Sequence, residues 1–200
     1  MKFLRLIAIF SLFVFAGCAT NPMKVSSSQV VTKPKAGDSQ VVFLRDSFLG
    51  NAINATLYDV TNGEPKFLGV IANGTKIVYD TKPGKHVFMV VSEAADYMEA
   101  KIAPGKTYYS IVTPRMGAWK ARFSLWPIRN DGSSKYNTQS DSFQGWLKST
   151  KLVENTDKSL EWYENNSNSV KAKHSEYWPV WEQKSPEDRA ARTLNINDGM

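Results

Sequence analysis

Apolar and polar residues alternate with a period of two through the middle of this chain. In the stretch 98–102, apolar residues alternate with Glu99 and Lys101, and the stretches 53–58 and 77–80 follow the same rule. A β-strand with one buried and one solvated face has this pattern, because successive side chains point to opposite sides of the sheet. The alternation therefore predicts a β-rich domain.

Turn-forming dipeptides separate these alternating runs at intervals of about ten residues, as in all-β domains. They are Asn62-Gly63, Asn73-Gly74, Pro83-Gly84 and Pro104-Gly105. Asn-Gly supplies the positive φ angles that tight hairpins require, and Pro followed by Gly suits the two corners of a turn. Short runs joined by such turns are typical of a sandwich or barrel.

The runs and turns together predict strands over 40–45, 52–59, 66–72, 75–80, 85–92, 97–103, 107–113 and 118–128. Two runs, 41–44 and 87–91, are apolar at every position, which predicts inner strands and leaves short buried helices as the alternative. The expected fold class is mainly β, an antiparallel β-sandwich over 39–130.

The remaining region, 131–200, predicts a polar loop followed by a helical tail. Asn155, Thr156 and Asp157 can cap a helix, and Pro179 should end or kink it near Tyr177. Its expected apolar stripe is Leu160, Tyr163, Val170 and Tyr177. Ser185 followed by Pro186 predicts a second helix that continues to about Leu194.

The tail is rich in tryptophan. Trp146, Trp162, Trp178 and Trp181 form a candidate partner surface, since exposed aromatic patches mark interaction sites. The alternative is that the helices dock these rings onto the sandwich.

The N-terminal segment 1–17 has the pattern of a secretory signal. Lys2 and Arg5 precede an apolar run over 6–15, which is too short to span a membrane as a helix. At its end, Phe15-Ala16-Gly17-Cys18 resembles the lipobox of bacterial lipoproteins, in which the cysteine is acylated and becomes the mature N-terminus. A plain signal peptide is the alternative.

Cys18 is the only cysteine of the chain, so no intrachain disulfide can form. The lipobox resemblance implies that Cys18 anchors the protein to a membrane through its acyl chains. Ala19, in place of Asp, resembles the sorting pattern of outer-membrane lipoproteins facing the periplasm. Residues 18–38 are rich in Ser, Pro, Lys and Thr and predict a flexible tether, with a short strand at 29–31 as the alternative.

The stretch 40–114 resembles the small PEGA-like and carboxypeptidase-regulatory-like sandwiches, which share the transthyretin-like architecture. It resembles more closely a family of uncharacterised bacterial lipoproteins. The matching residues are Val41-Val42-Phe43-Leu44-Arg45, Leu68-Gly69, Asn73-Gly74-Thr75, Pro83-Gly84-Lys85-His86 and Pro104-Gly105-Lys106-Thr107-Tyr108-Tyr109. The resemblance implies a non-enzymatic extracytoplasmic module, since such motifs transfer a fold but no activity.

Residues able to carry catalysis are scarce. His86 and His174 are the only histidines, and the sequence has no HExxH, GxSxG, Walker-type or GxGxxG motif. We therefore expect no catalytic residue, metal or cofactor. A less favoured hypothesis is a periplasmic hydrolase that uses His86 with a nearby carboxylate.

These observations predict a lipid-anchored protein of the bacterial envelope with a binding or structural β-sandwich. Its partners would be the membrane, through Cys18, and an envelope protein or glycan. The formal charge of +6 is weak support for an anionic partner, and export excludes nucleic acid. The alternative is a glycan- or peptide-binding protein that uses the aromatic tail.

Overall fold

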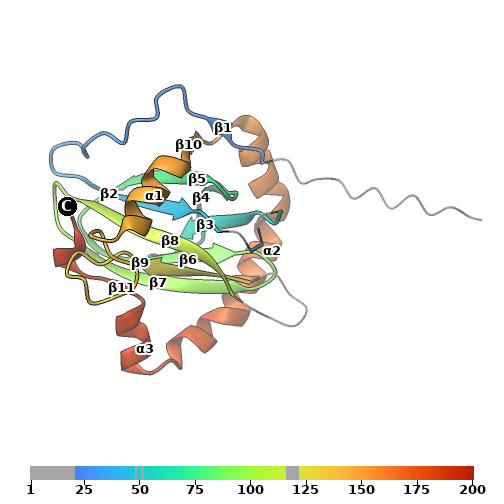
Figure 1. Ribbon diagram of the computed structural model, residues 1–200. Coiled ribbons are helices and arrows are strands. Elements are labelled where there is room, and N and C mark those ends of the chain that lie inside the picture. Colours follow the sequence, from blue (N-terminus) through green and yellow to red (C-terminus); the bar gives the residue numbers. More distant parts are fainter. Residues whose placement is uncertain (1–20, 48, 51, 116–121) are drawn as a thin grey trace, which may run out of the picture.

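The computed structural model describes residues 21–47, 49–50, 52–115 and 122–200. Two β-sheets pack face to face, and a helix covers the outer side of each sheet (Figure 1). The predicted signal segment 1–17 and the predicted acylation site Cys18 lie outside the described residues.

Sheet 1 has the strand order β1-β10-β5-β2-β8-β9, and sheet 2 has the order β11-β7-β6-β3-β4. The strands of sheet 1 are β1 (Lys24–Val25), β2 (Ser39–Arg45), β5 (Thr75–Thr81), β8 (Thr107–Arg115), β9 (Arg122–Pro127) and β10 (Lys151–Glu154). Those of sheet 2 are β3 (Ala55–Asp59), β4 (Lys66–Ile71), β6 (Gly84–Val91), β7 (Ala95–Ile102) and β11 (Thr193–Leu194).

Most neighbouring strands are antiparallel, whereas β2 with β8, β5 with β10 and β7 with β11 run parallel. The predicted mainly β sandwich with a helical tail is confirmed, and its sheets are mixed. Each predicted strand overlaps an observed one. The last begins at Arg122, and residues 118–121 of that prediction lie outside the described residues.

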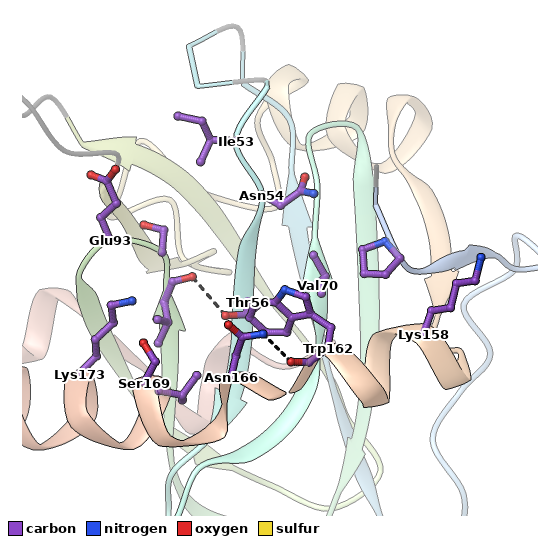
Figure 2. A pocket seen from close by; sticks show the side chains of 14 residues that line it. Ile53, Asn54, Thr56, Val70, Glu93, Lys158, Trp162, Asn166, Ser169 and Lys173 are labelled. Carbon is purple, nitrogen blue, oxygen red and sulfur yellow. Dashed lines mark hydrogen bonds between the residues drawn. The ribbon is translucent and has the colours of Figure 1, made fainter. Parts of the chain in front are cut away.

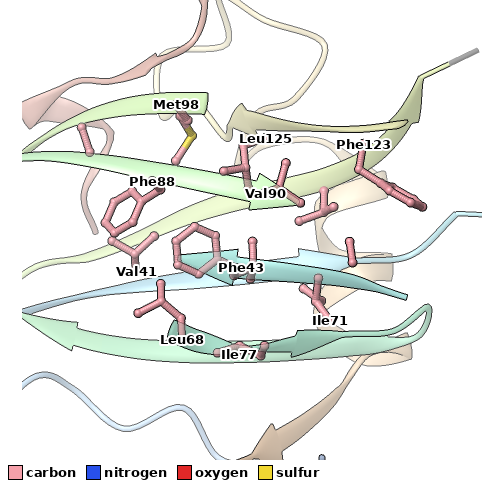
Figure 3. Packing of buried hydrophobic residues seen from close by; sticks show 14 of the residues in the cluster. Val41, Phe43, Leu68, Ile71, Ile77, Phe88, Val90, Met98, Phe123 and Leu125 are labelled. Atoms are coloured by element: carbon pink, nitrogen blue, oxygen red, sulfur yellow. The ribbon is translucent and has the colours of Figure 1, made fainter. Parts of the chain in front are cut away.

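The core lies between the two sheets (Figure 3). Phe43 of β2 meets Phe88 of β6 edge to face, with ring centroids 5.1 Å apart. All residues of β2 are buried, because sheet 1 is covered by sheet 2 on one face and by a helix on the other. The uninterrupted apolar run at 41–44 is therefore an inner strand, as predicted.

The helices are α1 (Asp141–Ser149), α2 (Asp157–Glu182) and α3 (Pro186–Ala191), followed by a 3-10 turn, η1 (Ile196–Asp198). Phe143 of α1 packs on sheet 1, and Val170 and Trp181 of α2 pack on sheet 2. Among the described residues, none of the helices combines the length and hydropathy needed to cross a bilayer.

The prediction of a flexible tether at 18–38 was wrong for residues 22–26, whereas residues 27–37 form no strand or helix and are mostly exposed. Met23 is buried in the core, and β1 pairs with β10. The Ser26 amide donates to the Leu152 carbonyl at 2.9 Å. The partner strand lies over 120 residues downstream, so no local pattern in this polar segment could reveal the pairing.

The tail also differs from its prediction. It supplies β10 to sheet 1 and β11 to sheet 2, so the sandwich extends beyond 39–130. The helix α1 was not predicted, and α2 runs through Pro179 rather than ending near Tyr177. The helix expected to reach Leu194 ends at Ala191, because the chain then joins sheet 2 beside β7.

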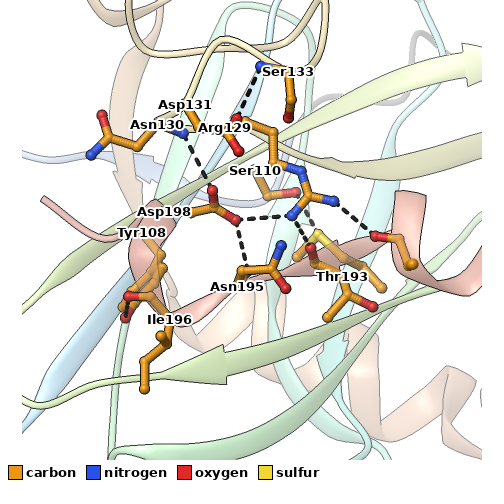
Figure 4. A network of polar contacts seen from close by, with 12 residues as sticks. Tyr108, Ser110, Arg129, Asn130, Asp131, Ser133, Thr193, Asn195, Ile196 and Asp198 are labelled. Atoms are coloured by element: carbon orange, nitrogen blue, oxygen red, sulfur yellow. Dashed lines mark hydrogen bonds and ion pairs between the residues drawn. The ribbon is translucent and has the colours of Figure 1, made fainter.

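A buried arginine fastens the C-terminal segment to the sandwich (Figure 4). Nη1 of Arg129 lies 3.0 Å from Oδ2 of Asp198, and Nη2 donates to the Ala190 carbonyl at 2.8 Å. The Tyr108 hydroxyl donates to the Ile196 carbonyl at 3.0 Å. These bonds satisfy buried polar groups and hold the segments before and after β11 against the sandwich.

Candidate functional site

The four tryptophans of the predicted partner surface do not form one surface. Trp146 lies on α1 with the cluster outside sheet 1, whereas the other three lie on α2 beside sheet 2. Trp181 is buried, and Trp178 packs against the Tyr97 ring at 5.2 Å. Trp162 is 36% exposed, more than the other three. The predicted common aromatic surface was therefore wrong, because the tail crosses from one face of the sandwich to the other.

Trp162 lines a groove of about 640 Å³ between α2 and sheet 2 (Figure 2). Its floor is formed by Thr56 of β3, Val70 of β4, Val91 of β6 and Val170 of α2. All four floor residues are buried. Concave sites of this size with a mainly apolar lining are the usual binding sites of small molecules.

One stripe of α2 forms a wall of the groove. Lys158, Trp162, Asn166, Ser169 and Lys173 are three or four residues apart and so share a helix face. The two lysines lie toward opposite ends of the groove in Figure 2. Nδ2 of Asn166 donates to the Trp162 carbonyl at 2.7 Å, as Figure 2 shows. The wall therefore presents one aromatic ring between two cationic ends.

The start of α2 positions one mouth of the groove. The Thr156 side chain accepts from the Ser159 amide, and the Ser159 side chain accepts from the Thr156 amide, which together form a capping box. The Thr156 hydroxyl also donates to the Pro22 carbonyl at 2.7 Å. Pro22 lines the groove, so the helix cap and the N-terminal segment meet at this mouth.

A buried arginine holds the part of the rim formed by Ile53. Nη2 of Arg45 donates to the carbonyls of Gly50 and Ile53, at 2.7 and 2.5 Å, and Nη1 donates to the Ile71 carbonyl at 2.8 Å. Its guanidinium lies 4.2 Å from the centroid of the Phe123 ring. Burial lowers the pKa of Arg45 to about 10. Arg45 thereby fixes the chain at Ile53, which lines the groove.

The other polar groups of the groove lie at its floor and rim. The Thr56 hydroxyl donates to the Val91 carbonyl at 3.3 Å, so the floor presents little free hydrogen-bonding capacity there. Glu93, on the rim, adds a negative charge. An elongated ligand with an apolar middle and polar ends matches this distribution.

His86, the candidate catalytic histidine, does lie beside a carboxylate. Its Nδ1 is 3.5 Å from Oδ2 of Asp59, and its Nε2 donates to the Lys82 carbonyl at 2.8 Å. The Tyr79 hydroxyl donates to Asp59 at 3.0 Å. Both ring nitrogens thus have partners within the protein, and the four described cavities are lined by other residues. This geometry favours a structural role for the pair.

Sequence reasoning identified Trp162 but missed its neighbours Lys158, Asn166, Ser169 and Lys173. Their spacing of three or four residues on a predicted helix could have shown that they share one helix face with Trp162. Leu160, assigned to the buried stripe, is 46% exposed, so the predicted face of the helix was partly wrong. Within the part of the chain that the structure describes, no three His, Cys, Asp or Glu side chains gather to hold a metal ion.

Comparison with known proteins adds one similarity. No protein-family model matches the chain. An uncharacterised protein of Haemophilus influenzae is 25% identical to it over 127 residues, which cover 61% of this chain and 73% of that protein. This similarity extends over much of both chains and carries no activity with it.

Proposed function

We propose that this chain is a lipid-anchored protein of the bacterial envelope whose sandwich is a non-enzymatic binding module. The groove between α2 and sheet 2 carries the proposal. Its apolar floor and charged ends suit an elongated amphipathic ligand. A binding role requires only such complementarity, whereas a hydrolase would need a substrate cavity beside His86.

The anchor is proposed from the N-terminal sequence. A short apolar signal ends in the lipobox-like Phe15-Ala16-Gly17-Cys18, and Ala19 favours the outer membrane. Acyl chains on Cys18 would hold the protein to the bilayer without a membrane-spanning helix. In cells fed a palmitate analogue, we expect label on the wild-type protein and none on Cys18→Ser. Label retained on Cys18→Ser would contradict the anchor.

The groove is tested by titrating the full chain with hexadecanoate that carries an environment-sensitive fluorophore. We expect saturable binding that Ser169→Trp reduces at least several-fold, because an indole there fills the groove. Ser175→Trp is the matched control, since Ser175 is an exposed residue of α2 that does not line the groove. Equal binding by the two variants would contradict a ligand site in this groove.

A glycan is the second candidate ligand. The partly exposed indole of Trp162 favours it, because sugars stack on aromatic faces. Titration with soluble envelope glycan fragments distinguishes the two ligands. A glycan ligand predicts binding to these fragments that Trp162→Ala abolishes, with no saturable binding of the hexadecanoate probe.

A further inference from the structure

The first residues that the structure describes lie beside the groove. Pro22 lines the groove, and its carbonyl is held by the Thr156 hydroxyl. The next residue, Met23, is buried, and its sulfur accepts from the Val70 amide at 3.4 Å. Everything N-terminal to Pro22 therefore starts from a fixed point at one mouth of the groove.

Cys18 is separated from Pro22 by only three residues, Ala19, Thr20 and Asn21. A fully extended chain spans at most about 3.6 Å per residue, so the Cα atoms of Cys18 and Pro22 lie within about 14 Å of each other. The 20-residue tether predicted from the sequence would have given a much longer reach. An acyl chain on Cys18 thus enters its membrane close to the groove.

The rim of the groove carries side chains suited to a membrane surface. Ile53 and Trp162 are large apolar residues exposed at 43% and 36%. Lys158 and Lys173 lie on α2, on either side of Trp162 along the helix. Tryptophan and isoleucine enter the boundary between headgroups and acyl chains, while lysine reaches anionic headgroups from an apolar stem.

We infer that the face bearing the groove docks on the lipid bilayer that holds Cys18, so that the groove opens toward the lipids and takes its ligand from them. This inference rests on the proposed acylation of Cys18 and deepens the proposed binding role. The short link fixes which face is near the bilayer, and the rim residues supply the contact. The α1 face, on the other side of the sandwich, points away from the membrane.

The test places a fluorophore on each face of the acylated full chain. Ser169→Cys labels the groove and Ser142→Cys labels α1; both serines are exposed. Acylation occupies Cys18, the only native cysteine, so each variant has a single reactive thiol. The proteins are bound to vesicles of phosphatidylethanolamine and phosphatidylglycerol that contain a nitroxide-labelled lipid.

We expect the nitroxide to quench the fluorophore at position 169 several-fold more than the one at 142. Two stacked sheets with a helix outside each separate these positions by roughly 30 Å, which exceeds the range of contact quenching. Equal quenching at the two sites, with acylation verified by palmitate label, would overturn docking and leave the anchor standing. Absence of the label would overturn the anchor and the docking together.

A charge test checks that the rim makes the contact. Lys158→Glu combined with Lys173→Glu should reduce quenching at position 169 on vesicles containing phosphatidylglycerol, because the lysines would no longer meet anionic headgroups. Lys135→Glu combined with Lys148→Glu is the control, since both residues are exposed and lie outside the groove. Equal loss in both double variants would contradict a specific rim contact.

Discussion

Nδ1 of His86 lies 3.5 Å from Oδ2 of Asp59, and this pair joins β6 to β3. Burial alone would raise the pKa of Asp59, but hydrogen bonds from His86, Thr61 and Tyr79 outweigh it and lower the pKa from 3.8 to about 2. Burial would lower the pKa of His86, yet Asp59 and the Lys82 carbonyl raise it above 6.5. The fold therefore stabilises both charged forms.

These shifts predict how stability depends on pH. The contribution of Asp59 is complete above its unfolded pKa of 3.8 and is lost as the pH falls toward 2. The contribution of His86 is complete below its unfolded pKa of 6.5 and is lost as the pH rises through the raised folded value. Asp59→Asn should therefore reduce the free energy of unfolding most between these two unfolded values, by on the order of 2 kcal/mol.

Urea denaturation of the wild type and Asp59→Asn, from below pH 3.8 to above pH 6.5, measures the difference at its maximum and its decline on either side. His174→Gln is the control, because His174 contacts Tyr97 rather than a carboxylate and burial lowers its pKa. A difference between wild type and Asp59→Asn that stays constant from acid to neutral pH would contradict the ion pair.

Arg192 should be the more important of two neighbouring arginines. Its Nη2 lies 2.5 Å from Oδ2 of Asp96, and its Nε donates to the Leu125 carbonyl at 2.6 Å. Both charged side chains are more than nine-tenths buried. Arg192→Met leaves the Asp96 carboxylate buried without its main partner, which should cost about 3 kcal/mol of stability.

Arg189→Met provides the comparison for Arg192→Met. Arg189 pairs with Glu99, but its side chain is 40% exposed, so its loss should cost less than about 1 kcal/mol. Denaturant midpoints of the two variants give the ranking. Equal destabilisation would mean that the buried pair does not fasten the C-terminal segment to β7.

The parts of the fold that could be predicted depend on local pattern. The strands from β2 to β8 alternate or run apolar between turns such as Asn73-Gly74, where Gly74 has φ +71° and joins β4 to β5. By contrast, β1 and β11 contain two residues each and exist only through distant partners. They are stabilised by pairing with β10 and β7, and the local sequence does not show which strands will be their neighbours.

The groove was predictable only in part for the same reason. The cap at Thr156 and the helical spacing from Lys158 to Lys173 are visible in the sequence. The floor, however, depends on how α2 crosses sheet 2, which brings Val170 to Thr56 and Val91. Trp146 and Trp162 look equivalent in the sequence and lie on opposite faces, because the chain passes through β10 between α1 and α2.

Arg45 should be essential for the rim of the groove. Its guanidinium is fully buried and donates to three backbone carbonyls, of Gly50, Ile53 and Ile71. Arg45→Lys cannot reach all three, so buried carbonyls lose their partners at a cost of about 1–3 kcal/mol. Hydrogen exchange should become faster at the Ile53 amide, which donates to the Gly50 carbonyl. Unchanged exchange there would show that the rim does not depend on Arg45.

The packing of the N-terminal residue Met23 against the sandwich is tested at Gly69, which lies in the irregular part of β4. Gly69 has φ +153°, and a Cβ there would approach Met23 Cε to 2.8 Å and Ile77 Cδ1 to 2.9 Å. Gly69→Ala should therefore destabilise the fold by about 1–3 kcal/mol, through strain and overpacking. Met23→Ala, which leaves a cavity at the same place, should cost about 2 kcal/mol by itself.

The double variant Gly69→Ala with Met23→Ala should lose less stability than the sum of the single losses, because the new methyl group occupies part of the space that Met23 leaves. Thermal and urea unfolding of the four proteins give this coupling. Gly84→Ala is the control for backbone strain, since Gly84 is also a strand residue with a φ of +139° and nothing lies within 4 Å of its Cβ position. Strict additivity would contradict the packing of Met23 on Gly69.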